Sequence, residues 1–255
     1  MKQTPVVLVH GAWFHRSCWA PWAERFGAHG YAVRVPARPG EAATVEQVRR
    51  DPGALDGLGL AALTAHYERI VRSLDEPPVL VGHSSGGLIV QQLLGAGLGR
   101  AAVALAPLPF GAPPAGPGRP AGTASLSRAR FRELVANAVD EREAAALFDR
   151  YAVPAPPRLL ADLGLGPAAG PADAVVDTAN EARGPLLLVS GQEDRVVPDA
   201  VTRSVYKRYG DSSAVTDLKQ FVDRGHSLVF DGGWRAVADH VLGWLAANGA
   251  RALGD

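Results

Sequence analysis

The sequence predicts an α/β fold: a mostly parallel sheet of about six strands, with helices on both faces and a helical cap insertion. Short apolar runs indicate strands that are buried on both sides, because they are continuous and do not alternate with polar residues. Segments with apolar residues at helical spacing separate these runs. Strand and helix therefore alternate along the chain, which is typical of a parallel sheet covered on both faces.

Six segments have the apolar and β-branched character of strands. They are residues 6–9, 31–35, 78–81, 101–106, 185–190 and 215–221. Helices with one apolar face are expected at residues 19–26, 60–74 and 234–245. A further helix at residues 88–94 is apolar on several sides, so we expect it to be deeply buried. Residues 36–58 combine proline, glycine and charge, which indicates a long surface excursion.

One block, residues 107–183, interrupts the alternation. Residues 107–122 contain six prolines and four glycines, too many for a helix or a strand, and residues 154–171 are again rich in both. Residues 127–150 are expected to form one or two helices. We expect one domain of residues 1–255, in which the block is inserted as a cap over the carboxyl ends of the strands, where open α/β sheets bind ligands. A simple surface elaboration is the alternative.

Composition limits the partners of the chain. Its 255 residues include 26 Lys plus Arg and 26 Asp plus Glu, so the formal net charge is zero and no overall field attracts nucleic acid or an anionic membrane. A single cysteine, Cys18, can form neither an intrachain disulfide nor a thiolate zinc cage. No signal-peptide pattern or membrane-spanning apolar stretch is evident, so a cytoplasmic location is expected. A small-molecule substrate remains the expected partner, and the oligomeric state is open.

The segment Gly82-His83-Ser84-Ser85-Gly86 matches the pattern G-x-S-x-G. It directly follows a predicted buried strand and directly precedes a predicted buried helix. This context predicts a nucleophile elbow, a sharp turn that projects the Ser84 hydroxyl above the sheet. A plain glycine-rich turn is the alternative.

A serine hydroxyl needs an adjacent base, and in this fold order the acid comes next and the histidine last. Asp194 follows the fifth predicted strand and His226 follows the sixth, so Ser84, Asp194 and His226 are the predicted triad. His226 would act as general base and then acid, while Asp194 would orient it. Glu193, Asp223 and Asp231 are rival acids.

A tetrahedral intermediate also needs N–H donors for its oxyanion. Ser85 is expected to supply one backbone N–H and Ala12, in the loop after the first strand, the other, with Trp13 as the substitute donor. Gly11 would let this loop approach closely, and His10 is expected to brace it. Aromatic rings are also candidates for lining the substrate pocket: Trp13, Phe14, His15, Phe110 and Phe131.

At these residues the sequence resembles the α/β-hydrolase superfamily over nearly the whole chain. The segment His10-Gly11-Ala12-Trp13 is similar to the oxyanion loop of its small esterase and hydroxynitrile-lyase-like branch. Hydroxynitrile lyases of this type carry a threonine beside the loop histidine and a lysine after the catalytic histidine, where this sequence has Gly11 and Ser227. Epoxide hydrolases and haloalkane dehalogenases usually carry an aspartate nucleophile, where this sequence has Ser84.

The resemblance implies a serine hydrolase that cleaves a small to medium, largely apolar carboxylic ester, thioester or lactone through an acyl-enzyme. It implies no metal and no organic cofactor. Two other classes stay open. One is a non-hydrolytic lyase, cyclase or acyl transferase on the same scaffold, and the other is a non-catalytic ligand-binding protein.

Overall fold

The computed structural model describes residues 3–111, 124–165 and 174–251. Its strands are β1 (Pro5–Val9), β2 (Ala32–Arg34), β3 (Val79–His83), β4 (Ala101–Leu105), β5 (Leu186–Gly191) and β6 (Thr216–Phe221). They form one sheet in the order β2-β1-β3-β4-β5-β6, and every neighbouring pair is parallel. The predicted fold class is therefore confirmed.

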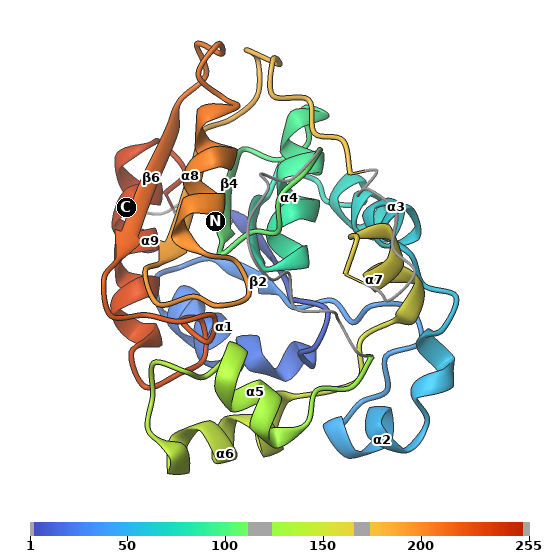
Figure 1. Ribbon diagram of the computed structural model, residues 1–255. Coiled ribbons are helices and arrows are strands. Elements are labelled where there is room, and N and C mark those ends of the chain that lie inside the picture. The colour runs from blue at the N-terminus through green and yellow to red at the C-terminus, as the bar shows by residue number, and fades with distance from the viewer. Residues whose placement is uncertain (1–2, 112–123, 166–173, 252–255) are drawn as a thin grey trace.

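Helices cover both faces of the sheet (Figure 1). On one face lie α1 (Ala20–Ala28) and α9 (Trp234–Ala247), which contact each other. On the other lie α3 (Leu60–Arg72), α4 (Ser85–Gly95) and α8 (Asp199–Lys207). This cover explains why β1, β3, β4 and β5 are buried along their full length. No helix in the described ranges is long and apolar enough to cross a bilayer.

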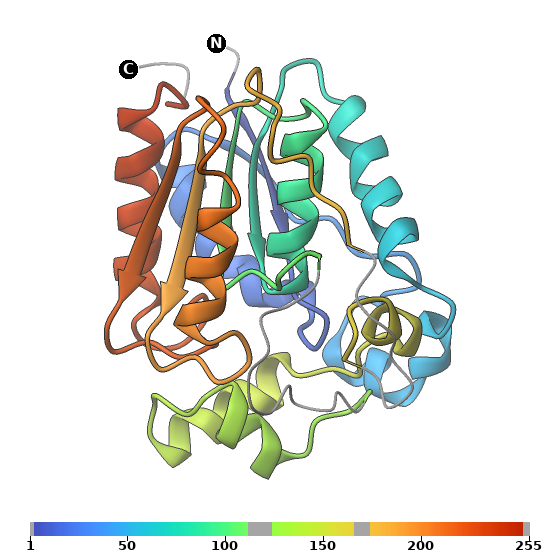
Figure 2. The same cartoon turned by 45° about the horizontal axis from the view of Figure 1, so that its top comes forward.

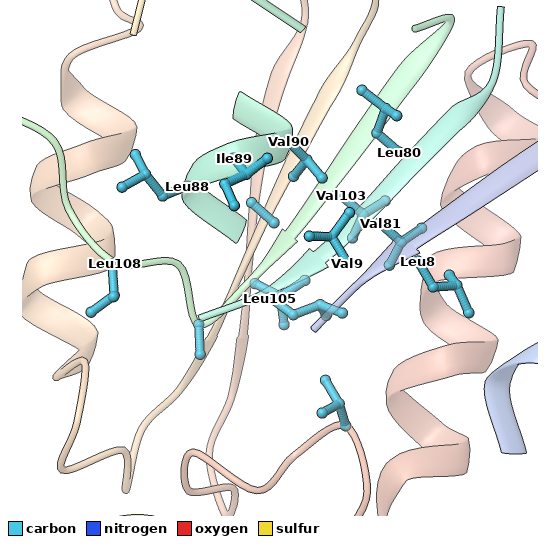
Figure 3. Close-up of a cluster of buried hydrophobic side chains, with 14 of the residues drawn as sticks. Leu8, Val9, Leu80, Val81, Leu88, Ile89, Val90, Val103, Leu105 and Leu108 are labelled. Carbon is cyan, nitrogen blue, oxygen red and sulfur yellow. The ribbon is translucent and has the colours of Figure 1, made fainter. Parts of the chain in front are cut away.

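The centre of the core lies between α4 and the strands that it crosses. Every residue of α4 except Gln92 is buried, as expected for a helix that is apolar on several sides. Figure 3 shows its Leu88, Ile89 and Val90 near side chains of the three central strands. This packing fixes the start of α4 relative to the ends of β1 and β3.

The strand order reverses direction between β1 and β3. The chain passes from β1 to β2 on one side, whereas β3 pairs with the opposite edge of β1. The loops that follow β1 and β3 therefore leave neighbouring carboxyl ends in opposite directions. Ligands of open α/β sheets bind in the crevice at such a switch point. The glycine-rich segments of both loops are thus placed at one site.

Residues 36–58 lie mostly at the surface, as expected, but they are not a plain loop. They contain α2 (Val45–Arg50), and a short 3₁₀ helix spans Pro52–Leu55; another spans Arg16–Trp19 after β1. A capping box between Thr44 and Gln47 begins α2. Apolar side chains of the segment form a small buried cluster with the inserted block: Val45, Val48, Leu55 and Val153.

The inserted block contributes α5 (Arg128–Leu134), α6 (Glu141–Tyr151) and α7 (Pro157–Asp162). Two helices thus occupy the stretch for which one or two were expected. In Figure 2, α5 and α6 lie beyond the ends at which the strand arrows terminate. Of the two proline- and glycine-rich segments, residues 112–122 and 166–171 lie outside the described residues.

Candidate active site

The turn that joins β3 to α4 holds Ser84. Its backbone has φ 57° and ψ −118°, a conformation that residues other than glycine rarely adopt. The Ser84 N–H donates to the Leu105 carbonyl at 3.0 Å, and the Ser84 carbonyl accepts from the Leu108 N–H at 3.1 Å. A Cβ on Gly86 would lie 2.2 Å from the Val9 carbonyl, so the turn needs glycine there. Strain of this kind costs about 1–3 kcal/mol and persists where the surroundings over-determine the backbone.

An acid–base pair connects the loops after β5 and β6. The Nδ1 atom of His226 lies 2.7 Å from Oδ2 of Asp194, and both side chains are fully buried. The other carboxylate oxygen, Oδ1, accepts from the N–H groups of Val196 at 2.8 Å and Val197 at 2.7 Å. Three donors thus fix the carboxylate. When Nδ1–H donates to it, Nε2 of His226 keeps the lone pair that a general base needs.

The rival acids are exposed or bonded to other groups. Glu193 and Asp223 are exposed. Asp231 is buried, but it accepts from the Ser227 hydroxyl at 2.8 Å and from the Gly233 N–H at 2.9 Å. Of the four acids considered, Asp194 is therefore the one whose carboxylate meets His226.

His83, next to the predicted nucleophile, supports the histidine loop. Its Nε2–H donates to the backbone carbonyl of His226 at 2.9 Å, and the two ring centroids are 4.6 Å apart. Burial lowers the pKa of His83 well below 6.5, and the adjacent His226 lowers it further. His83 therefore stays neutral. The sequence motif gave no sign of this role, because any residue type satisfies that position of G-x-S-x-G.

The loop after β1 lies against the Ser84 turn, and its Phe14 ring contacts the ring of His226. A Cβ built on Gly11 would lie 2.9 Å from Cβ of Ser84 and 2.9 Å from the Phe14 ring. The Phe14 ring centroid is in turn 6.1 Å from that of His226. Oγ of Ser84 and Nε2 of His226 are both buried without a hydrogen-bond partner among the described residues. Neither atom is therefore committed to another described group. In structures without substrate, the hydrogen bond between a serine and its base is often long and shortens only when substrate binds.

The two predicted oxyanion donors directly follow Gly11 and Ser84, the residues that approach each other. Ala12 and Ser85 are both buried. Ser85 is the first residue of α4, and the first N–H groups of a helix have no intrahelical partner and carry partial positive charge. An anion formed on a carbonyl next to Ser84 would be stabilised there.

A family profile described as "Alpha/beta hydrolase family" matches residues 6–240. The chain belongs to the alpha/beta hydrolase family. A search of the curated proteins finds no match to its sequence. The resemblance inferred from the sequence motifs is thus confirmed at the level of the superfamily.

Solved structures similar to this alpha/beta hydrolase carry the names of esterases and hydrolases. The methylesterase MES16 from Arabidopsis has a TM-score of 0.68 at 18% identity, over 96% of this chain and 99% of that one. A pyrethroid hydrolase from Sphingobium faniae JZ-2 has a TM-score of 0.66 at 18% identity, over 96% and 98%. Polyneuridine aldehyde esterase has a TM-score of 0.66 at 14% identity, over 95% and 99%. At such identities the likeness establishes the fold.

The five predicted lining residues of this alpha/beta hydrolase differ in their surroundings. Phe14 and Phe131 pack edge to face at 6.4 Å, and Phe14 also contacts the rings of His83 and His226. Trp13 is buried in the oxyanion loop. His15 instead caps the short helix after β1, where its Nδ1 accepts from the Ser17 N–H at 3.2 Å. The ring contacts of Phe110 are with Tyr209 and Arg208, so its described contacts lead away from the triad.

Three cavities lined by described residues lie outside the triad. The smallest, about 200 Å³, lies against Trp13 and is bordered by Phe148 and Val153 of the inserted block. The others, about 450 and 580 Å³, lie along α3 and beside α2. Within the described ranges, no three His, Cys, Asp or Glu side chains are grouped in a way that could hold a metal ion. Cys18 is buried, and burial raises the pKa of its thiol.

The neutral state of His83 predicts a pH-dependent stability. Below pH 6.5 the unfolded chain binds a proton at this histidine, whereas the native state, whose pKa is depressed, does not. The free energy of unfolding should therefore fall as the pH drops below 6.5, by about 1.4 kcal/mol per pH unit for this group. Urea unfolding between pH 7 and pH 5 measures the slope. His83→Gln, which keeps an N–H donor, should make the slope shallower; an unchanged slope would contradict the prediction.

Gly11→Ala should separate the loop after β1, the predicted oxyanion loop, from Ser84. Its Cβ would meet both Ser84 and Phe14 at 2.9 Å, so the loop itself or both neighbours must shift. Misplacement by about 1 Å can reduce turnover about 10²-fold, and we expect a loss of this size in kcat. Gly243→Ala is the matched control. Gly243 lies in α9 with no atom within 4 Å of the new Cβ, so stability should rise by about 1 kcal/mol with kcat unchanged. Equal kcat losses in both variants would refute the argument.

Proposed function

We propose that this chain is a serine hydrolase that cleaves a small to medium, largely apolar carboxylic ester, thioester or lactone through an acyl-enzyme on Ser84. The observation that carries the proposal is the 2.7 Å bond between Asp194 and His226, which are 32 residues apart in sequence. A buried aspartate that holds a histidine in one tautomer, near a serine in a strained strand-to-helix turn, is the arrangement that activates a hydroxyl.

In the proposed reaction, Oγ of Ser84 attacks the substrate carbonyl carbon while Nε2 of His226 takes its proton. The N–H groups of Ala12 and Ser85 stabilise the oxyanion of the tetrahedral intermediate. His226 then returns the proton to the leaving alcohol or thiol, and the acyl group stays on Ser84. Water attacks this acyl-enzyme, again through His226, and releases the carboxylic acid and the free serine.

The inserted block, residues 107–183, serves in this proposal as the cap that shapes the pocket. Hydrogen bonds connect it to three loops of the proposed site. The Val135 carbonyl accepts from the N–H after His226 at 3.0 Å, and Nδ2 of Asn137 donates to the Glu193 carbonyl, beside Asp194, at 2.7 Å. Val153 N–H donates to the Trp13 carbonyl in the oxyanion loop at 2.9 Å. A pocket closed in this way excludes water and selects substrate by shape.

Apolar contacts support the proposed substrate class. The Phe14 ring centroid lies 6.1 Å from that of His226, and the rings of Phe131 and Phe230 pack against Phe14 at 6.4 and 5.0 Å. The zero formal charge of the chain adds no overall selection for a charged substrate. Two of the similar structures are named as esterases, a methylesterase and polyneuridine aldehyde esterase, and ester cleavage is the reaction class proposed here.

A panel of esters, thioesters and lactones of graded chain length tests the proposal, with covalent labelling by a fluorophosphonate. We expect turnover that peaks at one acyl length and a label on Ser84, retained in the surface variant Ser73→Ala. Reaction in ¹⁸O-water distinguishes the chemistry, because hydrolysis places one solvent oxygen in the acid product. A product without solvent oxygen would favour a lyase, cyclase or transferase. Folded protein that neither reacts nor labels would favour a ligand-binding role.

A further inference from the structure

Arg38, in the loop after β2, is a buried cation without a place in the triad. Only 4% of its surface is exposed. Its Nη1 donates to the Ala12 carbonyl at 2.9 Å, and its Nη2 donates to the carbonyls of Phe14 at 2.7 Å and Gly11 at 3.2 Å. One guanidinium thus binds three carbonyls of the oxyanion loop. Its planar fork of donors is suited to this task, whereas the single ammonium of a lysine is not.

Because the peptide bond is planar, the carbonyl contacts of Arg38 also set the direction of the N–H group that follows each carbonyl. In a trans peptide, the carbonyl of one residue and the N–H of the next point in opposite directions. Arg38 holds the Gly11 carbonyl, so the Ala12 N–H points away from the guanidinium. Arg38 also holds the Ala12 carbonyl, so the Trp13 N–H points away from the guanidinium as well. These are the predicted oxyanion donor and its substitute.

The carboxylate of Glu41 and the ring of His10 lie against Arg38. Nε of Arg38 lies 3.7 Å from Oε1 of Glu41, and Oε2 of Glu41 lies 3.5 Å from Nε2 of His10. Burial acts to raise the pKa of Glu41, but His10 and Arg38 outweigh it and lower the pKa to about 2. The carboxylate is therefore charged and balances the guanidinium. Nη2 of Arg38 also contacts Nδ1 of His10 at 2.8 Å, so His10 braces the loop through Arg38.

The opposite side of the loop is also fixed. The His15 N–H donates to the Tyr151 carbonyl at 2.9 Å, and the Val153 N–H donates to the Trp13 carbonyl at 2.9 Å. The loop thus lies between the inserted block and Arg38, and its Gly11 faces Ser84. A loop restrained on several sides cannot turn its N–H groups toward a growing charge during the reaction. Their direction must be set beforehand, and such preorganisation is what makes oxyanion donors effective.

We propose that Arg38, paired with Glu41, is a positioning residue that aims the backbone N–H groups of Ala12 and Trp13 at the oxyanion. The proposal rests on the hydrolase function proposed above. Arg38 acts through the peptide groups and does not touch the substrate. Its contribution therefore belongs to the transition state and leaves ground-state binding almost unchanged.

Arg38→Lys is the direct test, on the ester that the wild-type enzyme cleaves fastest. We expect kcat to fall roughly 10²-fold, as when an oxyanion donor is lost, with KM within about threefold. Affinity for a boronic acid analogue of the tetrahedral intermediate should fall in parallel with kcat/KM, whereas affinity for the carboxylic acid product should not. Unchanged kcat, or an equal loss of affinity for both ligands, would overturn the proposal.

Arg183→Lys is the matched control. Arg183 is also buried, at 5% exposure, and donates to the carbonyls of Gly184 at 3.0 Å, Val215 at 3.1 Å and Ala214 at 3.3 Å. These carbonyls precede β5 and β6, at the end of the sheet opposite the triad. We expect a comparable drop in melting temperature with kcat unchanged. If Arg183→Lys lowers kcat as much as Arg38→Lys does, the effect is one of stability and the proposal fails.

Glu41→Gln keeps the test decisive if Arg38→Lys does not fold. It removes the counter-charge and leaves the guanidinium, so we expect a kcat loss of roughly 10-fold with KM unchanged; an unaltered kcat would overturn the proposal. Failure of the hydrolase function is distinguishable, because the wild type would then neither cleave esters nor label at Ser84. Wild-type turnover with an unaffected Arg38→Lys would refute the positioning role alone.

Discussion

Ser84→Ala is expected to lower kcat on any ester that the enzyme cleaves by about 10⁶-fold, because no other group in the proposed site can form the acyl-enzyme. A residual rate above that of water should persist through the oxyanion donors and substrate binding. The variant should fold at least as well as the wild type. Oγ of Ser84 is buried without a hydrogen-bond partner among the described residues, and removing such a group does not destabilise. Melting temperature and single-turnover kinetics measure the two effects.

A double variant provides the control for this loss. If Ser84 and His226 act as one unit, Ser84→Ala combined with His226→Ala should lose no more activity than Ser84→Ala alone. Additive losses would mean that His226 contributes independently of the serine. Wild-type turnover by Ser84→Ala itself would end the proposal of an acyl-enzyme on this residue.

The centre of the sheet could be predicted because β1, β3, β4 and β5 are buried on both faces. Such strands are continuous apolar runs, and the predicted 78–81 and 185–190 lie almost wholly within β3 and β5. The contact between Asp194 and His226 could be predicted for a related reason. Each follows a strand, and the carboxyl ends of parallel strands meet at one edge of the sheet.

The Arg38–Glu41 pair could not be predicted in the same way. Residues 36–58 have the composition of an exposed loop, and nothing local distinguishes a buried arginine from a solvated one. Arg38 is buried because the loop after β1 offers it three carbonyls, and this contact depends on the tertiary fold. The prediction that His15 lines the pocket failed for a different reason. His15 lies close in sequence to the oxyanion loop, but its Nδ1 caps a helix, and side-chain direction does not follow from proximity in sequence.

Asp194→Asn is expected to reduce kcat by about 10⁴-fold while leaving the backbone in place. The structure fixes the direction of the new amide. Two N–H groups, from Val196 and Val197, point at Oδ1, so the asparagine must place its oxygen there and turn its NH₂ toward His226. Nδ1 of His226 then has to accept a hydrogen bond, which moves the ring proton to Nε2. A histidine in that tautomer cannot take the proton of Ser84.

Asp231→Asn is the control for a general effect of removing a buried charge. Asp231 is also buried and lies five residues beyond His226, but its partners are the Ser227 hydroxyl and the Gly233 N–H. Its amide variant leaves the His226 tautomer unchanged, so we expect kcat within about 10-fold of the wild type. The ring-nitrogen chemical shifts of His226 report the tautomer directly, and they should change in Asp194→Asn and not in Asp231→Asn. Similar activity losses with unchanged shifts would show that Asp194 supports the fold and not the base.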